Sequence, residues 1–311
     1  MAAITEQFSE KIGQEIAITG RSQRQQLVGA AMVVLSTAAI AIVPSFARLA
    51  YDGGSDTLTV IAGRSIVTAV ACFLIAAVLG RSLRIPQRSL TVSLGLGVLY
   101  AAHLYGFLGA VSYLPVNMAI LIYFLHPLMI GVAAMSAGRQ TVSPLRLGAL
   151  IAAVVGLTLA VGFSLGGLSL LGVALASLAA VMAAVIITSS AAVMRDSDSL
   201  AVTSYMMLSA AFCLSVFSLA QGNVKLPITG LGWLGLGGVA LSHTIGTLTF
   251  FSAIPLLGAV RAAMITNLEP VLGILFAMLI LGERLSAAQA VGIALVIASI
   301  FAMELKRPTA K

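Results

Sequence analysis

Several ionisable side chains lie inside long apolar runs of the sequence, where such groups are costly. One charge at the centre of a membrane helix costs about 2.5–3.5 kcal/mol on insertion scales, so its presence indicates a specific role. The foremost case is Glu269, which directly precedes Pro270 in the apolar run 257–281. A carboxylate there can exchange a proton or bind a cation. Alternatively, Glu269 bonds backbone groups that a kink at Pro270 leaves free.

The three histidines of the chain, His103, His126 and His243, each fall near the middle of an apolar run. Histidine exchanges protons at physiological pH, so these side chains can hold a ligand or take part in proton movement. The alternative is a neutral imidazole that joins two helices by a hydrogen bond. The histidines and Glu269 come from separate runs without the local spacing of metal ligands, so we expect no metal and no other cofactor.

Two tyrosines share helix faces with two of these histidines. Tyr100 precedes His103 by three residues, and Tyr123 precedes His126 by the same spacing. Residues three apart lie on one face of a helix. An aromatic and polar face suits an organic ligand that carries a ring or an amine. Aromatic residues that face lipid or other helices are the structural alternative.

Arg64 and two prolines complete the candidate site. Arg64 lies seven residues into the apolar run 57–79, where it can attract an anionic group or pair with Glu269. Its long side chain can instead reach the membrane surface. Pro127 and Pro270 interrupt apolar runs and are predicted hinge positions, because proline removes one helical hydrogen bond.

The composition places all these residues in a membrane protein. Of 311 residues, 60% are hydrophobic and 9% are charged, and the mean hydropathy is +1.10. A soluble globular chain is nearer 45–50% apolar and about 25% charged. The net charge of +7 forms no basic stripe, so we expect the lipid bilayer and not a nucleic acid as the partner. The composition predicts an all-α polytopic membrane protein.

The apolar runs predict ten transmembrane helices. A helix needs about 20 residues to cross a hydrocarbon layer of about 30 Å. Breaks at charged residues and at glycine and proline clusters divide the chain into spans at 27–47, 57–79, 90–112, 115–137, 145–163, 168–194, 200–220, 231–253, 257–281 and 284–304.

The loops predict the orientation of these spans. Twelve Lys and Arg residues fall on the side of the N-terminus and three on the other side, so both termini are expected in the cytoplasm, at residues 1–26 and 305–311. Apolar residues recur at every fourth position of the N-terminal tail, as in Ile4, Phe8 and Ile12. Both an interfacial helix and a structureless tail fit this pattern.

The sequence contains an internal repeat, predicted at 27–165 and 166–304. Matching residues follow at slowly drifting offsets of 140 to 144, as in His103 with His243, Asp56 with Asp198, and Pro127 with Pro270. Each copy contains five spans, so the second copy enters the membrane from the opposite side. Inverted-topology repeats around a central site are typical of secondary transporters.

The second copy carries a recognisable motif. The segments Asn267–Pro270 and Leu281–Leu285, followed by Gln289 and Gly292, resemble the C-terminal signature of the EamA-like drug/metabolite transporters. The resemblance covers about residues 27–304. It implies ten helices in two inverted five-helix repeats around a central cavity, and export or exchange of small metabolites.

The first copy is similar but departs from the family pattern. It retains His126-Pro127 and Gly148, and Arg64 resembles an arginine often found at that place in the family. At Gly138-Arg139, many members have an acidic residue after the glycine. The two repeat ends are therefore not expected to carry the same gate.

We therefore predict a secondary active transporter of the inner membrane. It would move a small organic metabolite (an amino acid, an amine or a related compound) as an exporter or exchanger that works by alternating access. Protons are a candidate partner, and the sequence leaves the coupling ion open. A passive channel is the alternative, although no span shows a continuous polar stripe. Gly162–Gly166 matches the G-x-S-x-G pattern of hydrolases, but it lacks the strand–turn–helix context, so we expect no enzyme.

Overall fold

The computed structural model describes residues 23–111, 113–114, 116–136, 144–161, 169–222, 224–281 and 286–305. The predictions for the N-terminal and C-terminal tails, for Gly138-Arg139 and for the G-x-S-x-G segment lie wholly or mostly outside these residues.

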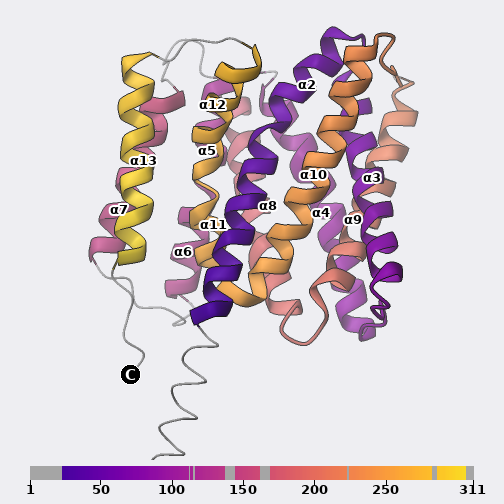
Figure 1. The fold of residues 1–311 in the computed structure, drawn as a ribbon, viewed down its shortest axis with the longest axis horizontal. Helices are drawn as coiled ribbons and strands as arrows, with labels where there is room; N and C mark the ends of the chain where they lie inside the picture. Colours follow the sequence, from indigo (N-terminus) through magenta and orange to yellow (C-terminus); the bar gives the residue numbers. More distant parts are fainter. Residues whose placement is uncertain are drawn as a thin grey trace, which may run out of the picture.

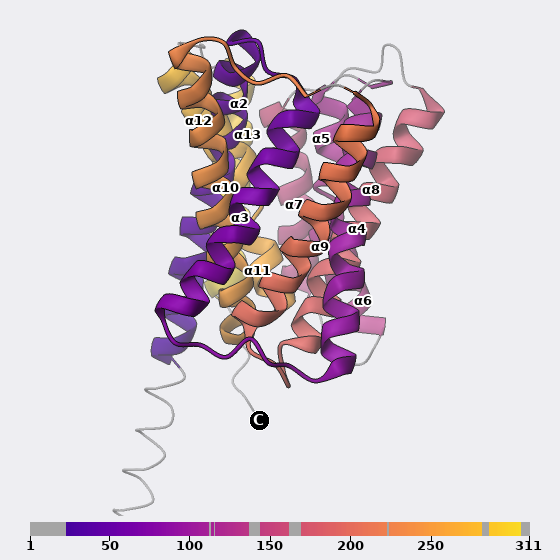
Figure 2. The same cartoon turned by 90° about the vertical axis from the view of Figure 1, so that its right-hand side faces the viewer.

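The described chain is built from helices that stand side by side along roughly one axis (Figures 1 and 2). Within a bilayer the backbone must satisfy its own hydrogen bonds, which an apolar segment achieves as a helix. A helix at residues 23–41 is followed by α2 (Val43–Asp52), α3 (Thr57–Val78), α4 (Gln87–Val111), α5 (Val116–Tyr123), α6 (His126–Ser136), α7 (Pro144–Val161), α8 (Leu170–Val193), α9 (Ser199–Ala220), α10 (Gly230–Leu257), α11 (Ala259–Ile265), α12 (Leu268–Leu281) and α13 (Ala287–Leu305).

Seven segments in the described ranges are long and apolar enough to cross a membrane: Gln23–Asp52, Thr57–Val78, Gln87–Phe107, Leu170–Val193, Ser199–Ala220, Gly230–Leu257 and Ala259–Phe276. The other three predicted spans correspond to the broken pair α5 and α6, to α7 and to α13. The multi-pass membrane architecture is therefore confirmed, and the count of ten stays a prediction.

The outer surface of the bundle is apolar, as a lipid-facing surface must be. Val78 and Leu170 are each 85% exposed, and Phe212 is 69% exposed. Hydroxyl side chains within the spans commonly donate to a carbonyl four residues earlier in their own helix. Ser65 donates to the Ile61 carbonyl and Thr203 to the Ser199 carbonyl. Such bonds lower the free-energy cost of placing these hydroxyl groups inside a membrane.

The helix pairings follow the internal repeat. Helix α3 packs on α9, α7 on α13, and α6 on α11. Helix α4 packs on α8 and α9, while α10, its counterpart in the second copy, packs on α2 and α3. Exchanging the two halves of the chain converts the α3–α9 and α7–α13 pairings into themselves, and it converts the pairings of α4 with α8 and α9 into those of α10 with α2 and α3. The same helical unit is therefore used twice.

Glycines allow the closest of these helix contacts. A Cβ atom added at Gly97 of α4 would lie 2.2 Å from the Met206 carbonyl oxygen of α9. One added at Gly235 of α10 would lie 2.5 Å from the backbone nitrogen of Ala50 in α2. Small residues let helix backbones approach closely where the hydrophobic effect gives no driving force between helices.

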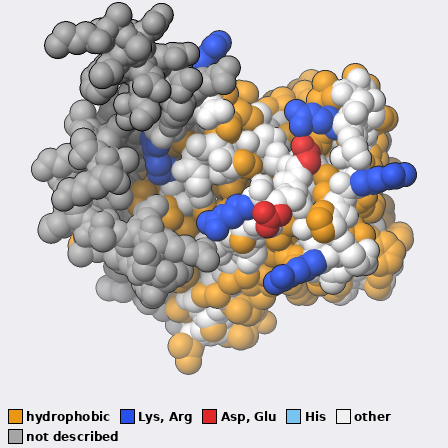
Figure 3. Space-filling view, turned by 90° about the horizontal axis from the view of Figure 1, so that it is seen from below, with side chains coloured by type: hydrophobic (Ala, Val, Ile, Leu, Met, Phe, Trp, Pro, Cys, Tyr) orange, Lys and Arg blue, Asp and Glu red, His pale blue; other side chains and the backbone are white. Residues whose placement is uncertain are grey.

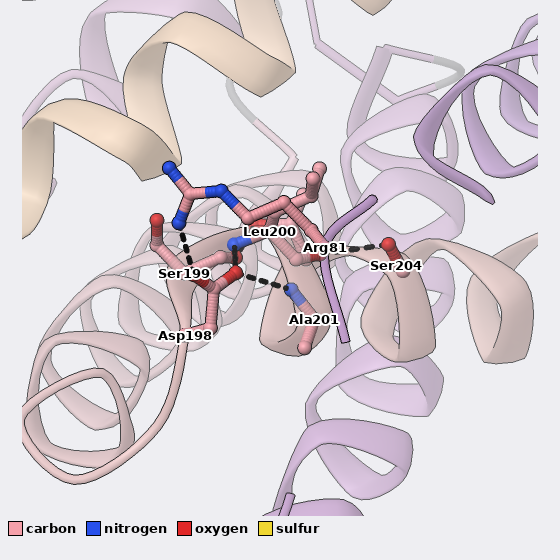
Figure 4. A network of polar contacts seen from close by, with 7 residues as sticks. Arg81, Asp198, Ser199, Leu200, Ala201 and Ser204 are labelled. Atoms are coloured by element: carbon pink, nitrogen blue, oxygen red, sulfur yellow. Dashed lines mark hydrogen bonds and ion pairs between the residues drawn. The ribbon is translucent and has the colours of Figure 1, made fainter. Parts of the chain in front are cut away.

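Two aspartates that match each other in the repeat tie the halves together at the helix ends. Asp198 accepts hydrogen bonds from the Leu200 and Ala201 amides at the start of α9, and its Oδ2 lies 2.9 Å from Arg81 Nη1 (Figure 4). Asp56 directly precedes α3 as its N-cap residue and accepts a hydrogen bond from the Lys225 amide, in the loop before α10. Each aspartate thus contacts a loop of the other copy.

Arginines are concentrated on one end of the bundle. The loops around Arg81 and Asp198 share that end, and Figure 3 shows the basic side chains there. The described cations of this end are Arg24, Arg81, Arg84, Arg88, Arg195 and Arg261, the last of which bonds Gln26 in the first helix. The end where Asp56 meets Lys225 carries Arg48 and Lys225 among the described residues.

Candidate central site

A cavity of about 310 Å³ lies within the helix bundle, between residues of both repeat copies. Its lining comes from the first helix and from α2, α3, α4, α5, α6, α8, α10 and α12, together with the turn before α12. All of the polar residues that the sequence singled out line it: Arg64, Tyr100, His103, Tyr123, His126, His243 and Glu269. The fold therefore brings together side chains from six helices, which span residues 57 to 281 of the chain.

Two broken helices deliver His126 and Glu269 to the cavity. Turns at Phe124-Leu125 and Thr266-Asn267 separate α5 from α6 and α11 from α12. His126 and Glu269 then lie in the first turn of α6 and α12, 143 residues apart in the sequence and each followed by proline. Proline costs little in a first turn, where its missing N–H would have no helical partner. The prolines therefore begin new half-helices and do not bend continuous ones.

Glu269 lies where a carboxylate is favoured. The first turn of a helix has unbonded N–H groups and the positive end of the helix dipole, which stabilise a negative charge. The Glu269 side chain has no hydrogen bond or ion pair within the described residues. It is also the sole carboxylate among the described residues that line the cavity. Its charge is therefore available to a ligand or a proton.

His243 is held by two hydrogen bonds. Its Nε2 lies 3.0 Å from the Tyr100 hydroxyl, and its Nδ1 lies 2.9 Å from the Thr68 hydroxyl. The Thr68 oxygen also lies 2.9 Å from the Thr244 hydroxyl. With 2% of its surface exposed, the imidazole joins α3, α4 and α10. This geometry fixes the orientation of Tyr100 at the cavity wall.

His103, the repeat counterpart of His243, has different surroundings. It is 7% exposed, and its buried Nδ1 makes no hydrogen bond within the described residues. Its ring stacks on Tyr123, with centroids 5.4 Å apart and planes inclined by 30°. Tyr123 also contacts His126, at 4.9 Å between centroids, and Phe107, at 5.3 Å. One wall of the cavity is thus a cluster of rings centred on Tyr123.

Arg64 also faces this cavity from α3. Its Nε is buried and has no hydrogen-bond partner within the described residues. No described Arg64 nitrogen lies within 4.0 Å of a Glu269 oxygen. The sequence left open whether Arg64 reaches the membrane surface or pairs with Glu269. The described structure shows no ion pair between the two, and the Arg64 residue is partly exposed.

The sequence analysis missed several residues of the lining. Ser36 and Thr37 come from the first helix, and Ser36 Oγ donates to the Gly246 carbonyl at 2.7 Å. Thr247 follows His243 by one helical turn, and Thr266 lies in the turn before α12. Two features of the sequence could have identified these residues: Ser36 and Thr37 form an adjacent polar pair in an apolar run, and Thr247 follows His243 by four positions on the same helix face.

Removal of the Thr68 hydroxyl is expected to destabilise the protein by about 1–3 kcal/mol, because Thr68→Val leaves the buried His243 Nδ1 without a partner. Thermal unfolding of the purified protein measures this loss, and Thr68→Ser should restore most of it. Thr249→Val is the matched control, because the Thr249 hydroxyl bonds only carbonyls of its own helix. Equal losses in both valine variants would contradict a special role for the Thr68–His243 bond.

Comparisons with known proteins agree with this two-copy arrangement. The family model described as EamA-like transporter family matches residues 27–162 and again residues 170–305. No curated protein matches the chain. A solved structure described as "Crystal structure of protein" superposes with a TM-score of 0.74 at 18% sequence identity. The alignment covers 91% of the present chain and 98% of the chain in that structure. At this identity the likeness concerns the fold alone.

Proposed function

The chain belongs to the EamA-like transporter family of the drug/metabolite transporter superfamily. From this premise we propose that it is a secondary active transporter of a small organic metabolite. It works as an exporter or exchanger. Members of this family are membrane transporters and not enzymes. The observation that carries the proposal is the central cavity, which residues of both repeat copies line and where a carboxylate has no partner among the described residues.

In this proposal the two copies, 27–165 and 166–304, are inverted five-helix repeats that rock about the cavity. Support comes from the matched aspartates. Asp56 contacts Lys225 at one end of the bundle, whereas Asp198 contacts Arg81 at the opposite end. Equivalent residues at opposite ends are expected when the two copies cross the membrane in opposite directions.

The basic end of the bundle then faces the cytoplasm of a cell with an inner membrane. Loops rich in Lys and Arg stay on the cytoplasmic side during insertion. In this orientation both termini lie inside the cell. Support for the N-terminus comes from the first helix, which begins at the basic end of the bundle (Figure 1).

The residues of the cavity take distinct roles in the transport cycle. Glu269 gains or loses a proton as the cavity opens to one side or the other, and thereby couples cargo movement to the proton gradient. His103, Tyr123 and His126 contact the cargo, while His243 holds Tyr100 in place. The half-helices that begin near Pro127 and Pro270 move at their connecting turns.

The transport proposal is tested by mass spectrometry of the medium around cells that overproduce the protein and around cells with an empty vector. A compound enriched in the medium only with the protein supports export and identifies the cargo. A compound depleted only with the protein supports uptake. Identical media, together with identical uptake of a panel of labelled metabolites, would contradict the proposal. A pore would differ from a gradient-driven carrier because it would equalise the cargo concentration on the two sides of the membrane without an imposed ion gradient.

A further inference from the structure

The Arg64 guanidinium is a fixed positive charge at the cavity. Arginine stays protonated in proteins, so Arg64 cannot neutralise itself by losing a proton. Its Nε is buried, and none of its nitrogens lies within 4.0 Å of a described carboxylate. The Arg64 residue as a whole is partly buried. A cation that is partly removed from water and has no close counter-ion is unfavourable, so the site is suited to an anion supplied from outside the chain.

The other ionisable groups around the cavity do not balance this charge permanently. They are Glu269 from α12, the histidines of α4, α6 and α10, and the phenol groups of Tyr100 and Tyr123. Glutamate can be neutralised by a proton, whereas Arg64 cannot. The formal charge of Arg64 and Glu269 together is therefore zero with Glu269 ionised and positive with Glu269 protonated. In both states the guanidinium favours a negative group on the ligand.

The ring cluster adds a second requirement. Tyr123 lies between His103 and His126, with centroid distances of 5.4 and 4.9 Å, and Phe107 approaches it at 5.3 Å. Rings in offset or inclined arrangements bind further planar groups at similar distances. A cavity of about 310 Å³ is at the lower end of ligand-pocket sizes, so one small molecule fills it.

We propose that the cargo is a small carboxylate with a planar ring: Arg64 binds its carboxylate and the cluster around Tyr123 contacts its ring. This inference deepens the proposed function and rests on it for the identity of the cavity as the cargo site. A zwitterion fits the cavity with Glu269 ionised, since its ammonium group pairs with that carboxylate. A simple anion fits the cavity with Glu269 protonated.

Calorimetric binding to the purified full chain in lipid nanodiscs tests this assignment. The probes are phenylalanine, 3-phenylpropanoate, phenylalaninamide and phenethylamine, which share one ring and differ in their charged groups. We expect the two carboxylates to bind at least about tenfold more tightly than the amide and the amine, because charge-assisted hydrogen bonds to arginine are strong. Alanine, which lacks the ring, should bind at least about tenfold more weakly than phenylalanine.

Variants of Arg64 assign the effect to this side chain. Arg64→Gln should weaken carboxylate binding by about 10- to 100-fold and leave phenethylamine unchanged, and Arg64→Lys should restore part of the affinity. Arg261→Gln is the matched control, because Arg261 also belongs to an apolar span but bonds Gln26 and does not line this cavity. Size-exclusion profiles confirm that each variant is folded.

Three results would overturn the inference: phenethylamine binding as tightly as the carboxylates, undiminished carboxylate binding by Arg64→Gln, or absence of carboxylate binding to the wild type. Alanine binding as tightly as phenylalanine would remove the ring requirement. Carboxylate binding without any transport in the cell assay would leave this site in place and reject the proposed function. Transport of a cargo that has no carboxylate would support the proposed function and reject the assignment of Arg64 as the carboxylate-binding residue.

Discussion

Glu269→Gln is expected to abolish proton-driven transport while the protein stays folded. Glutamine has nearly the size and shape of glutamate but cannot exchange a proton at physiological pH. Glu269 is the sole carboxylate among the described cavity residues, so no acidic neighbour in this lining replaces it. Its removal also relieves the cost of a charge inside the membrane, about 2.5–3.5 kcal/mol on insertion scales, so the variant should be at least as stable as the wild type.

The measurement uses purified protein in liposomes with an imposed pH gradient and the cargo found in the cell assay. We expect the initial rate of gradient-driven transport to fall at least about 100-fold. Exchange of cargo for cargo, which needs no net proton movement, should continue at a measurable rate. Asp52→Asn is the matched control, because Asp52 is an exposed carboxylate that pairs with Arg48 at one end of the bundle. Full gradient-driven transport by Glu269→Gln would remove Glu269 from the coupling mechanism.

Gly97→Ala is expected to destabilise the protein. The added methyl group would lie 2.2 Å from the Met206 carbonyl oxygen and 2.7 Å from Ser209 Cβ. The nearest of these atoms belongs to the backbone of α9, so α4 and α9 must separate to make room. Overpacking of this kind costs about 1–3 kcal/mol, and here the contact joins two helices of different repeat copies.

Gly95→Ala provides the control for this prediction. Gly95 lies two residues earlier in α4, and a Cβ added there would meet no atom within 4 Å. Alanine favours a helix over glycine by up to about 1 kcal/mol, so this variant should be as stable as the wild type or more stable. Thermal unfolding in detergent compares the two variants directly. Equal melting temperatures would show that α4 and α9 are not in this close contact.

The class of protein and its helical structure followed from the sequence because both depend on local properties. An apolar run of about 20 residues can satisfy its backbone in a membrane only as a helix, wherever its neighbours lie. Polar residues such as Glu269 and His103 stand out against such runs, and the structure collects all the predicted ones around one cavity. Their roles in transport remain predictions.

Other features depended on how the helices pack. His103 and His243 are equivalent in the sequence repeat, yet only His243 has both ring nitrogens bonded in the described structure. The helix break near Glu269 falls at Thr266-Asn267, whereas the sequence located the hinge at Pro270. Hydrogen-bond partners and break positions depend on the rotation and tilt of each helix against its neighbours. Tertiary contacts set that rotation and tilt, and hydrophobic periodicity is weak in helices that are apolar on every face.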